Sequence, residues 1–95
     1  MSDVFEAIAA PARRAILDEL VERDGQTLFE LCTRLAVRQQ IGLTRQAISQ
    51  HLEVLESAGL VRSVRQGRYK LHHLQPAPLE EIVRRWLRPR EGEHK

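Results

Sequence analysis

The spacing of hydrophobic residues predicts two helices in the first 25 positions. A short stripe near the N-terminus is followed by a longer one, in which hydrophobic residues recur every three or four positions. The members of the two stripes are Val4, Phe5, Ile8, Ile16, Leu17, Leu20 and Val21. Pro11 suits the first position of the second helix, and Gly25 is expected to end it. The charges on this helix alternate in sign, as they do on an ordinary solvent-facing surface, at Asp18, Glu19, Glu22 and Arg23.

A third helix is predicted to begin at the segment TLFE, residues 27–30. This segment is a capping box, in which Thr27 is the N-cap and Glu30 reaches back to it from three residues later. The hydrophobic stripe of this helix contains Leu28, Leu31, Cys32 and Leu35. Gly42 is expected to interrupt the run.

The fourth predicted helix is hydrophobic on one side and polar, without acids, on the other. Thr44 is its expected N-cap, and Gly59 should end it in a Schellman-type turn. Its hydrophobic side comprises Leu43, Ala47, Ile48, Leu52, Leu55 and Ala58. Its polar side begins with Arg45, Gln46, Ser49 and Gln50, and no acid occurs from Leu31 to Leu52.

After residue 60 the hydrophobic period changes from 3.6 to 2. The runs LVRSVR and RYKLHHL flank the dipeptide QG, which predicts a β-hairpin with Gly67 in its turn. A final helical stripe follows two prolines and contains Leu79, Ile82, Val83, Trp86 and Leu87. The predicted order is therefore α-α-α-α-β-β-α, a mainly α fold with a β-hairpin wing, in one domain spanning residues 1–95.

Composition and charge narrow the functional classes. The chain has one cysteine and no hydrophobic run near the roughly 18 residues that a membrane span requires. Its N-terminus has acids where a signal peptide needs basic residues, so a cytoplasmic location is expected. Residues 31–79 hold seven Lys or Arg against two acids, a balance of +5, whereas residues 1–30 hold three Arg against seven acids, a balance of −4.

These charges favour double-stranded DNA as a partner. Gln side chains match the adenine edge in the major groove, Arg matches guanine, and Ser adapts to either. The predicted hairpin carries four basic residues and residues 57–79 contain no acid, as a wing lying along a phosphate backbone would require. An edge hairpin protected from aggregation by charge is the alternative for the hairpin alone. There is no phosphate-binding glycine loop and no nucleophile beside a base, so an enzyme is not expected.

Three segments together resemble the ArsR family of winged-helix transcriptional repressors. They are PARRAILDEL, TRQAISQHLEVLESAGLV and VRQGRYKLHHL, and the likeness covers roughly residues 4–88. The resemblance implies a homodimer on a palindromic operator, with the terminal helices, including Val4, Phe5, Ile8, Ile82, Val83, Trp86 and Leu87, at the dimer interface. It also implies base and phosphate contacts by Thr44, Arg45, Gln46, Ser49 and Gln50, with Arg65 and Arg68 at the wing tip.

The sequence departs from the family pattern in two places. Metal-sensing members carry Cys-x-Cys on the helix before the reader, but here Arg34 stands at the second cysteine, and residues 79–88 contain no histidine. No metal or other cofactor is therefore expected, although a metal-responsive repressor remains an alternative. The inserted run AVRQQI, residues 36–41, should lengthen the third helix by more than a turn or form an enlarged loop, and Arg38 is expected to add a phosphate contact.

The remaining polar residues are interpreted more simply. Cys32 is expected to be a buried small hydrophobe, and His72 and His73 should face opposite sides of a strand. Arg13 and Arg14 are expected to pair with surface acids such as Asp18 and Glu22, with DNA backbone contact as the alternative. The role of His51 is left open between helix packing and phosphate contact. An unknown effector is compatible with the sequence, and a winged-helix module that binds only protein is the rival function.

Overall fold

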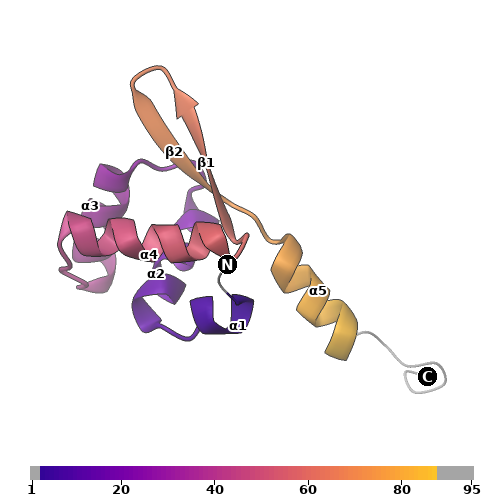
Figure 1. Ribbon diagram of the computed structural model, residues 1–95. Helices are drawn as coiled ribbons and strands as arrows, with labels where there is room; N and C mark the ends of the chain where they lie inside the picture. Colours follow the sequence, from indigo (N-terminus) through magenta and orange to yellow (C-terminus); the bar gives the residue numbers. More distant parts are fainter. Residues whose placement is uncertain (1–2, 88–95) are drawn as a thin grey trace.

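The computed structural model describes residues 3–87 and has the predicted order of elements (Figure 1). These are α1 (Val4–Ala7), α2 (Pro11–Glu22), α3 (Leu28–Gln39), α4 (Arg45–Ser57), β1 (Val61–Gln66), β2 (Tyr69–Leu74) and α5 (Ala77–Trp86). The four N-terminal helices form a compact body, from which the β1–β2 hairpin and α5 project in different directions. The mainly α fold with a hairpin wing is confirmed.

The local signals in the sequence fix the ends of the helices. Thr27 and Glu30 form both bonds of a capping box, with Glu30 N to Thr27 Oγ1 at 3.1 Å and Thr27 N to Glu30 Oε1 at 2.9 Å. At the end of α4, Gly59 has φ +80°, and the N–H of Leu60 donates to the carbonyl of Leu55 at 2.9 Å. Together with the bond from Gly59 N to Glu56 O, this is a Schellman motif, as predicted.

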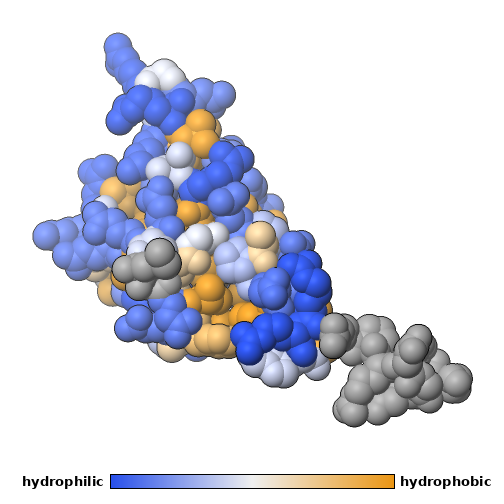
Figure 2. All heavy atoms as spheres, turned by 45° about the vertical axis from the view of Figure 1, so that its right-hand side comes forward, coloured by the Kyte–Doolittle hydropathy of each residue, from blue (hydrophilic) through white to orange (hydrophobic). Residues whose placement is uncertain are grey.

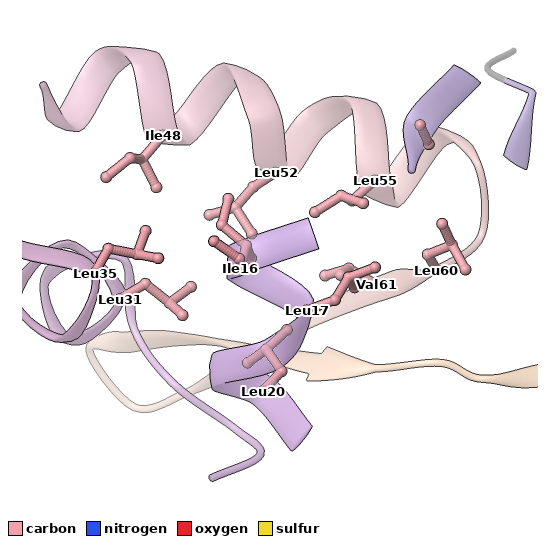
Figure 3. Close-up of a cluster of buried hydrophobic side chains, with 12 residues drawn as sticks. Ile16, Leu17, Leu20, Leu31, Leu35, Ile48, Leu52, Leu55, Leu60 and Val61 are labelled. Carbon is pink, nitrogen blue, oxygen red and sulfur yellow. The ribbon is translucent and has the colours of Figure 1, made fainter. Parts of the chain in front are cut away.

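The core lies where α2, α3 and α4 meet the base of the hairpin (Figure 3). In this view the side chains of Ile48, Leu52 and Leu55 point from α4 toward α2 and α3. The fully or almost fully buried hydrophobic side chains are Ala7, Ala15, Ile16, Leu17, Leu20, Leu31, Leu35, Ile48, Leu52, Leu55, Leu60 and Val61. Because this core holds the hydrophobic side of α4, the other side of that helix is turned outward.

The structure corrects three expectations about the helical faces. Val21 and Leu43 were placed on buried stripes, but they are 68% and 40% exposed. Glu19, interpreted as part of a solvent-facing pattern, is only 2% exposed.

Of the two outcomes predicted for the insertion, the structure shows the longer helix. Residues 36–39 are helical, and α3 ends before Gly42, with Gln40 in the left-handed region at φ 53°.

The hairpin is closed by a tight turn and is paired along its length. Its register runs from Val61 opposite Leu74 to Gln66 opposite Tyr69, which leaves Gly67 and Arg68 as a two-residue loop. Gly67 has φ +64°, which suits the first central position of a type II′ turn. Within residues 3–87, no helix is both long and hydrophobic enough to cross a membrane.

Candidate DNA-reading surface

The first half of α4 presents the predicted polar residues to solvent. Thr44 caps the helix by accepting a hydrogen bond from Ala47 N at 3.0 Å. Arg45, Gln46 and Gln50 are exposed and Ser49 is half-buried, while Ile48 beneath them is fully buried. The helix is therefore anchored by one side and offers amide, guanidinium and hydroxyl groups on the other, which are the groups that hydrogen-bond to base edges.

The hairpin contributes a second set of exposed cations. Arg62, Arg65, Arg68 and Lys70 are all exposed, and Arg68 lies in the turn at the tip. Across residues 3–87, none of these side chains forms an ion pair or a side-chain hydrogen bond. The same holds for Arg45. Their charge is consequently available to a polyanion.

A groove of about 1000 Å³ lies between α4, the start of α3 and the hairpin. Arg45 and Ser49 line it from α4, and Arg68 and Lys70 line it from the hairpin. The groove also contains the acids Glu30, Glu53 and Glu56, together with the exposed aromatic rings of Phe29 and Tyr69. Two of the predicted reading residues, Arg45 and Ser49, thus border the same groove as the wing cations Arg68 and Lys70, which the sequence could not establish.

The root of the hairpin is tied to the segment between α2 and α3. Gln26 and His72 exchange backbone hydrogen bonds of 3.1 and 2.7 Å, and His72 Nδ1 also donates to the carbonyl of Gln26 at 2.9 Å. Asp24 accepts from the N–H of Leu74 at 2.7 Å and from His73 Nδ1 at 2.8 Å. As predicted, the two histidines have different surroundings, because His72 is buried and His73 contacts an exposed acid.

These contacts shift two pKa values. Burial lowers the pKa of His72, although its hydrogen bond to Gln26 opposes that shift. Burial alone would raise the pKa of Asp24, but the hydrogen bonds from Leu74 and His73 outweigh it, and the net pKa is lowered. The wing root therefore combines a neutral buried imidazole with an ionised carboxylate.

Within residues 3–87, Arg13 and Arg14 do not form the surface ion pairs that we expected. Arg13 donates to the carbonyls of Ala7 and Glu6 at 2.7 and 3.2 Å, and Arg14 donates to the carbonyls of Ile8 and Ala9. Both guanidinium groups thus satisfy carbonyls at the end of α1, where cations are favoured. The sequence favoured acids because the short α1 gave no sign that its carbonyls would need donors.

His51 is a packing residue that contacts Arg13. The guanidinium of Arg13 lies 3.2 Å from His51 Nδ1, so that nitrogen is the acceptor, and the side chain of His51 is half-buried. Burial lowers the pKa of His51, and the nearby charge of Arg13 lowers it further. The contact joins α2 and α4, which supports the helix-packing role of the two that the sequence left open.

Arg38 is held by acids on α2. Buried Glu19 accepts hydrogen bonds from Arg34 Nε at 2.9 Å, Arg38 Nε at 3.1 Å and Gln39 Nε2 at 2.7 Å. Arg38 also lies 3.9 Å from the exposed Glu22. The extension of α3 therefore serves to bind α2, and the guanidinium of Arg38 is not a free cation of the kind found on the hairpin.

The terminal helices carry hydrophobic side chains that the described chain does not cover. Phe5, Val83, Trp86 and Leu87 are 48%, 49%, 56% and 73% exposed, and Val4, Ile8 and Ile82 are partly exposed. The rings of Phe5 and Trp86 lie 6.1 Å apart, so α1 and α5 contribute to one hydrophobic face. The hydrophobic surface in the lower half of Figure 2 lies in this part of the molecule. No residue of α5 is buried.

No cluster of potential metal ligands is present among residues 3–87. No three side chains of the types His, Cys, Asp and Glu gather at a metal-binding distance in this part of the chain. Cys32 is partly buried and packs against the core, and burial raises the pKa of its thiol. The thiol is thus kept protonated, which makes it a poor metal ligand.

A capped reading helix, a basic hairpin after it and a groove between them define the class of winged helix-turn-helix proteins. Comparison with known proteins identifies the family. Residues 8–64 match the family model described as a helix-turn-helix domain. The chain is 45% identical over 84 residues to the uncharacterized HTH-type transcriptional regulator YuzN of Bacillus subtilis. The matched residues are 88% of this chain and 91% of that protein.

Two further matches are also transcriptional regulators. The transcriptional repressor SdpR of Bacillus subtilis is 29% identical over 87 residues, which are 92% of this chain and 88% of that one. Among solved structures, an ArsR-like transcriptional regulator from Rhodococcus superposes with a TM-score of 0.74 at 36% identity, covering 86% of this chain and 69% of the other. This chain belongs to the ArsR family of winged helix-turn-helix regulators. It is a DNA-binding transcriptional regulator and not an enzyme.

Proposed function

We propose that this regulator is a repressor that binds a pseudo-palindromic operator as a homodimer. Its reading residues are Thr44, Arg45, Gln46, Ser49 and Gln50, and the wing contacts the backbone through Arg65 and Arg68. We omit Arg38 from this set because Glu19 binds its guanidinium. The repressor role is supported by the likeness to SdpR, which is named a transcriptional repressor.

The observation that carries the proposal is the set of unpaired polar groups bordering the groove. Arg45 and Arg68 line this groove and have no partner among residues 3–87, although the chain contains enough acids to neutralise them. Exposed cations that form no ion pair bind phosphates by releasing counterions. The amides of Gln46 and Gln50 lie on the same helix and can select bases.

The dimer is supported by the hydrophobic face of α1 and α5. A 95-residue chain can bury only a modest core, and α5 buries none of its own side chains. Packing Phe5, Val83, Trp86 and Leu87 against the same face of a second copy would cover them. Two reading helices related in this way would enter successive major grooves about 34–36 Å apart, which requires a symmetrical site.

Binding titrations on duplex DNA from the promoter of the protein's own gene would test the reading residues. Gln50→Ala should weaken specific binding by about 1–3 kcal/mol and relax base preference at one position. Arg68→Ala should weaken binding to all sequences and lower the slope of log affinity against log salt by roughly one. Arg84→Ala is the matched control, because it removes the same charge from α5.

If Gln50→Ala retains both affinity and base preference, the assignment of α4 as the reader is wrong. If the wild type binds neither this promoter nor random DNA, a module that binds only protein becomes the better description.

Sedimentation equilibrium would test the dimer independently of DNA. Trp86→Ala should raise the dimer dissociation constant by at least about tenfold, because large aromatic residues dominate the binding energy of interfaces. Val21→Ala is the control, since Val21 is also an exposed hydrophobic residue, at 68% against 56% for Trp86, but lies on α2. A wild-type protein that stays monomeric at tens of micromolar would refute the proposed assembly.

A further inference from the structure

The outward side of α4 carries two exposed acids, Glu53 and Glu56, after the acid-free polar stripe of its first two turns. Glu53 follows Ser49 and Gln50 by about one turn, is exposed and lines the groove toward the hairpin. At 3.6 residues per turn, Glu53 lies within about 20° of Gln46 around the helix axis and about 4.5 Å beyond Gln50 along it. It therefore stands within the stripe of proposed reading residues.

The carboxylate of Glu53 is uncompensated within the described chain. It forms no ion pair and no hydrogen bond with any residue between 3 and 87. Glu56, less than one turn later, differs because it accepts a hydrogen bond of 2.8 Å from Ser63 Oγ. A free carboxylate facing DNA is repelled by phosphates, so its place in the stripe needs a hydrogen-bond donor on the DNA.

The floor of the major groove offers few such donors. Guanine presents two acceptors there and thymine presents the O4 acceptor, so both repel a carboxylate. Cytosine presents its N4 amino group without a neighbouring acceptor on the same base, whereas adenine places the N7 acceptor beside its amino group. A Glu side chain on the central line of a reading helix is therefore matched to cytosine.

We propose that Glu53 is a specificity-determining residue that accepts a hydrogen bond from the N4 amino group of a cytosine, next to the base that Gln50 reads. The inference rests on the proposed DNA-reading role of α4 and adds the base class at one further position. Glu53 selects among sequences at the cost of overall affinity, because its charge opposes the phosphates in every complex.

The test selects binding sites from a library of randomised DNA duplexes with the full-length protein. The wild type should prefer C·G at one position of each half-site by at least about fivefold, in line with the usual cost of a mismatch. Glu53→Ala should reduce that preference below about twofold and raise affinity for random DNA. Glu53→Gln should transfer the preference to A·T, since Gln pairs with adenine.

Asp18→Ala provides the matched control, because it removes one exposed acid from α2 and should change no base preference. Circular dichroism should give native spectra for all variants, since Glu53 makes no contact that folding requires. If Glu53→Ala and Glu53→Gln strengthen binding to every sequence equally, or leave the selected site unchanged, the inference is refuted. A loss of preference with Gln50→Ala but not with the Glu53 variants would refute this inference and leave the proposed function standing, whereas a wild type that selects no site would refute both.

Discussion

Glu19→Ala should be the most destabilising single substitution of a charged residue in the helical body. Glu19 is 2% exposed and holds α3 against α2 by accepting hydrogen bonds from Arg34, Arg38 and Gln39. Alanine removes the shared acceptor and leaves two guanidinium groups facing each other across the space it occupied. The perturbation is therefore the loss of three bonds together with a repulsion between like charges.

The exposure of the two arginines limits the expected loss. Breaking a fully buried ion pair costs about 3–5 kcal/mol, because the remaining charge stays desolvated. Here the side chains of Arg34 and Arg38 are 24% and 46% exposed, so water can reach both guanidinium groups once Glu19 is removed. We expect a loss of about 2–3 kcal/mol in the free energy of unfolding. For a domain of this size, that loss corresponds to a fall of roughly 10–20 °C in Tm.

Urea unfolding followed by circular dichroism, at one fixed protein concentration, would measure the loss. Glu22→Ala is the control, because Glu22 is 62% exposed and lies 3.9 Å from Arg38, and it should change stability by less than about 0.5 kcal/mol. A Glu19→Ala protein within that same margin of the wild type would refute the argument.

The pH dependence gives a second check on Glu19. Burial alone would raise the pKa of Glu19, but hydrogen bonds from Gln39, Arg34 and Arg38 outweigh it, and the net pKa is below the ordinary 4.5. The stabilisation is therefore present above pH 4.5 and is lost as the pH falls through the lower pKa of the folded state. The difference between the wild type and Glu19→Ala should shrink in the same range.

Three further outcomes concern stability. The pKa values of His51 and His72 lie below the ordinary 6.5. The fold is therefore most stable above pH 6.5, where both imidazoles are neutral, and the free energy of unfolding should fall as the pH drops below 6.5. A flat urea midpoint from pH 7.5 to 5.5 would contradict this. Thr27→Ala should cost about 1 kcal/mol through loss of the capping box, whereas Thr33→Ala in the exposed middle of α3 should not destabilise. Gly59→Ala should cost about 1 kcal/mol or more from its φ of +80° alone, because the added Cβ would lie at an ordinary 3.6 Å from Pro78; an unchanged midpoint would exclude the strain.

Features encoded by neighbouring residues were predictable from the sequence. The capping box at Thr27 and the Schellman turn at Gly59 each depend on a few consecutive residues, and both are present. The outward placement of Gln46 and Gln50 followed from the helical period, because the hydrophobic residues between them had to face the core.

Features that depend on tertiary packing were not predictable. The burial of Glu19 is decided by donors that arrive 15 to 20 residues later, on α3. Arg13 was assigned to acids because the carbonyls that it caps belong to another helix. Glu53 drew no attention because it follows the acid-free segment of α4, and the groove places it on one surface with Arg68 of the hairpin.

The β1–β2 hairpin is attached to the helical body at its root, far from its turn. Its root is held by five hydrogen bonds between Asp24 or Gln26 and residues 72–74, whereas Gly67 and Arg68 lie in the turn at the opposite end. Because the hairpin is held at its root, its motion should increase toward the tip. Amide hydrogen exchange should therefore slow progressively from the tip toward His72. Binding DNA would then immobilise only the last few residues, and the entropic cost of seating Arg68 on a phosphate would be confined to them.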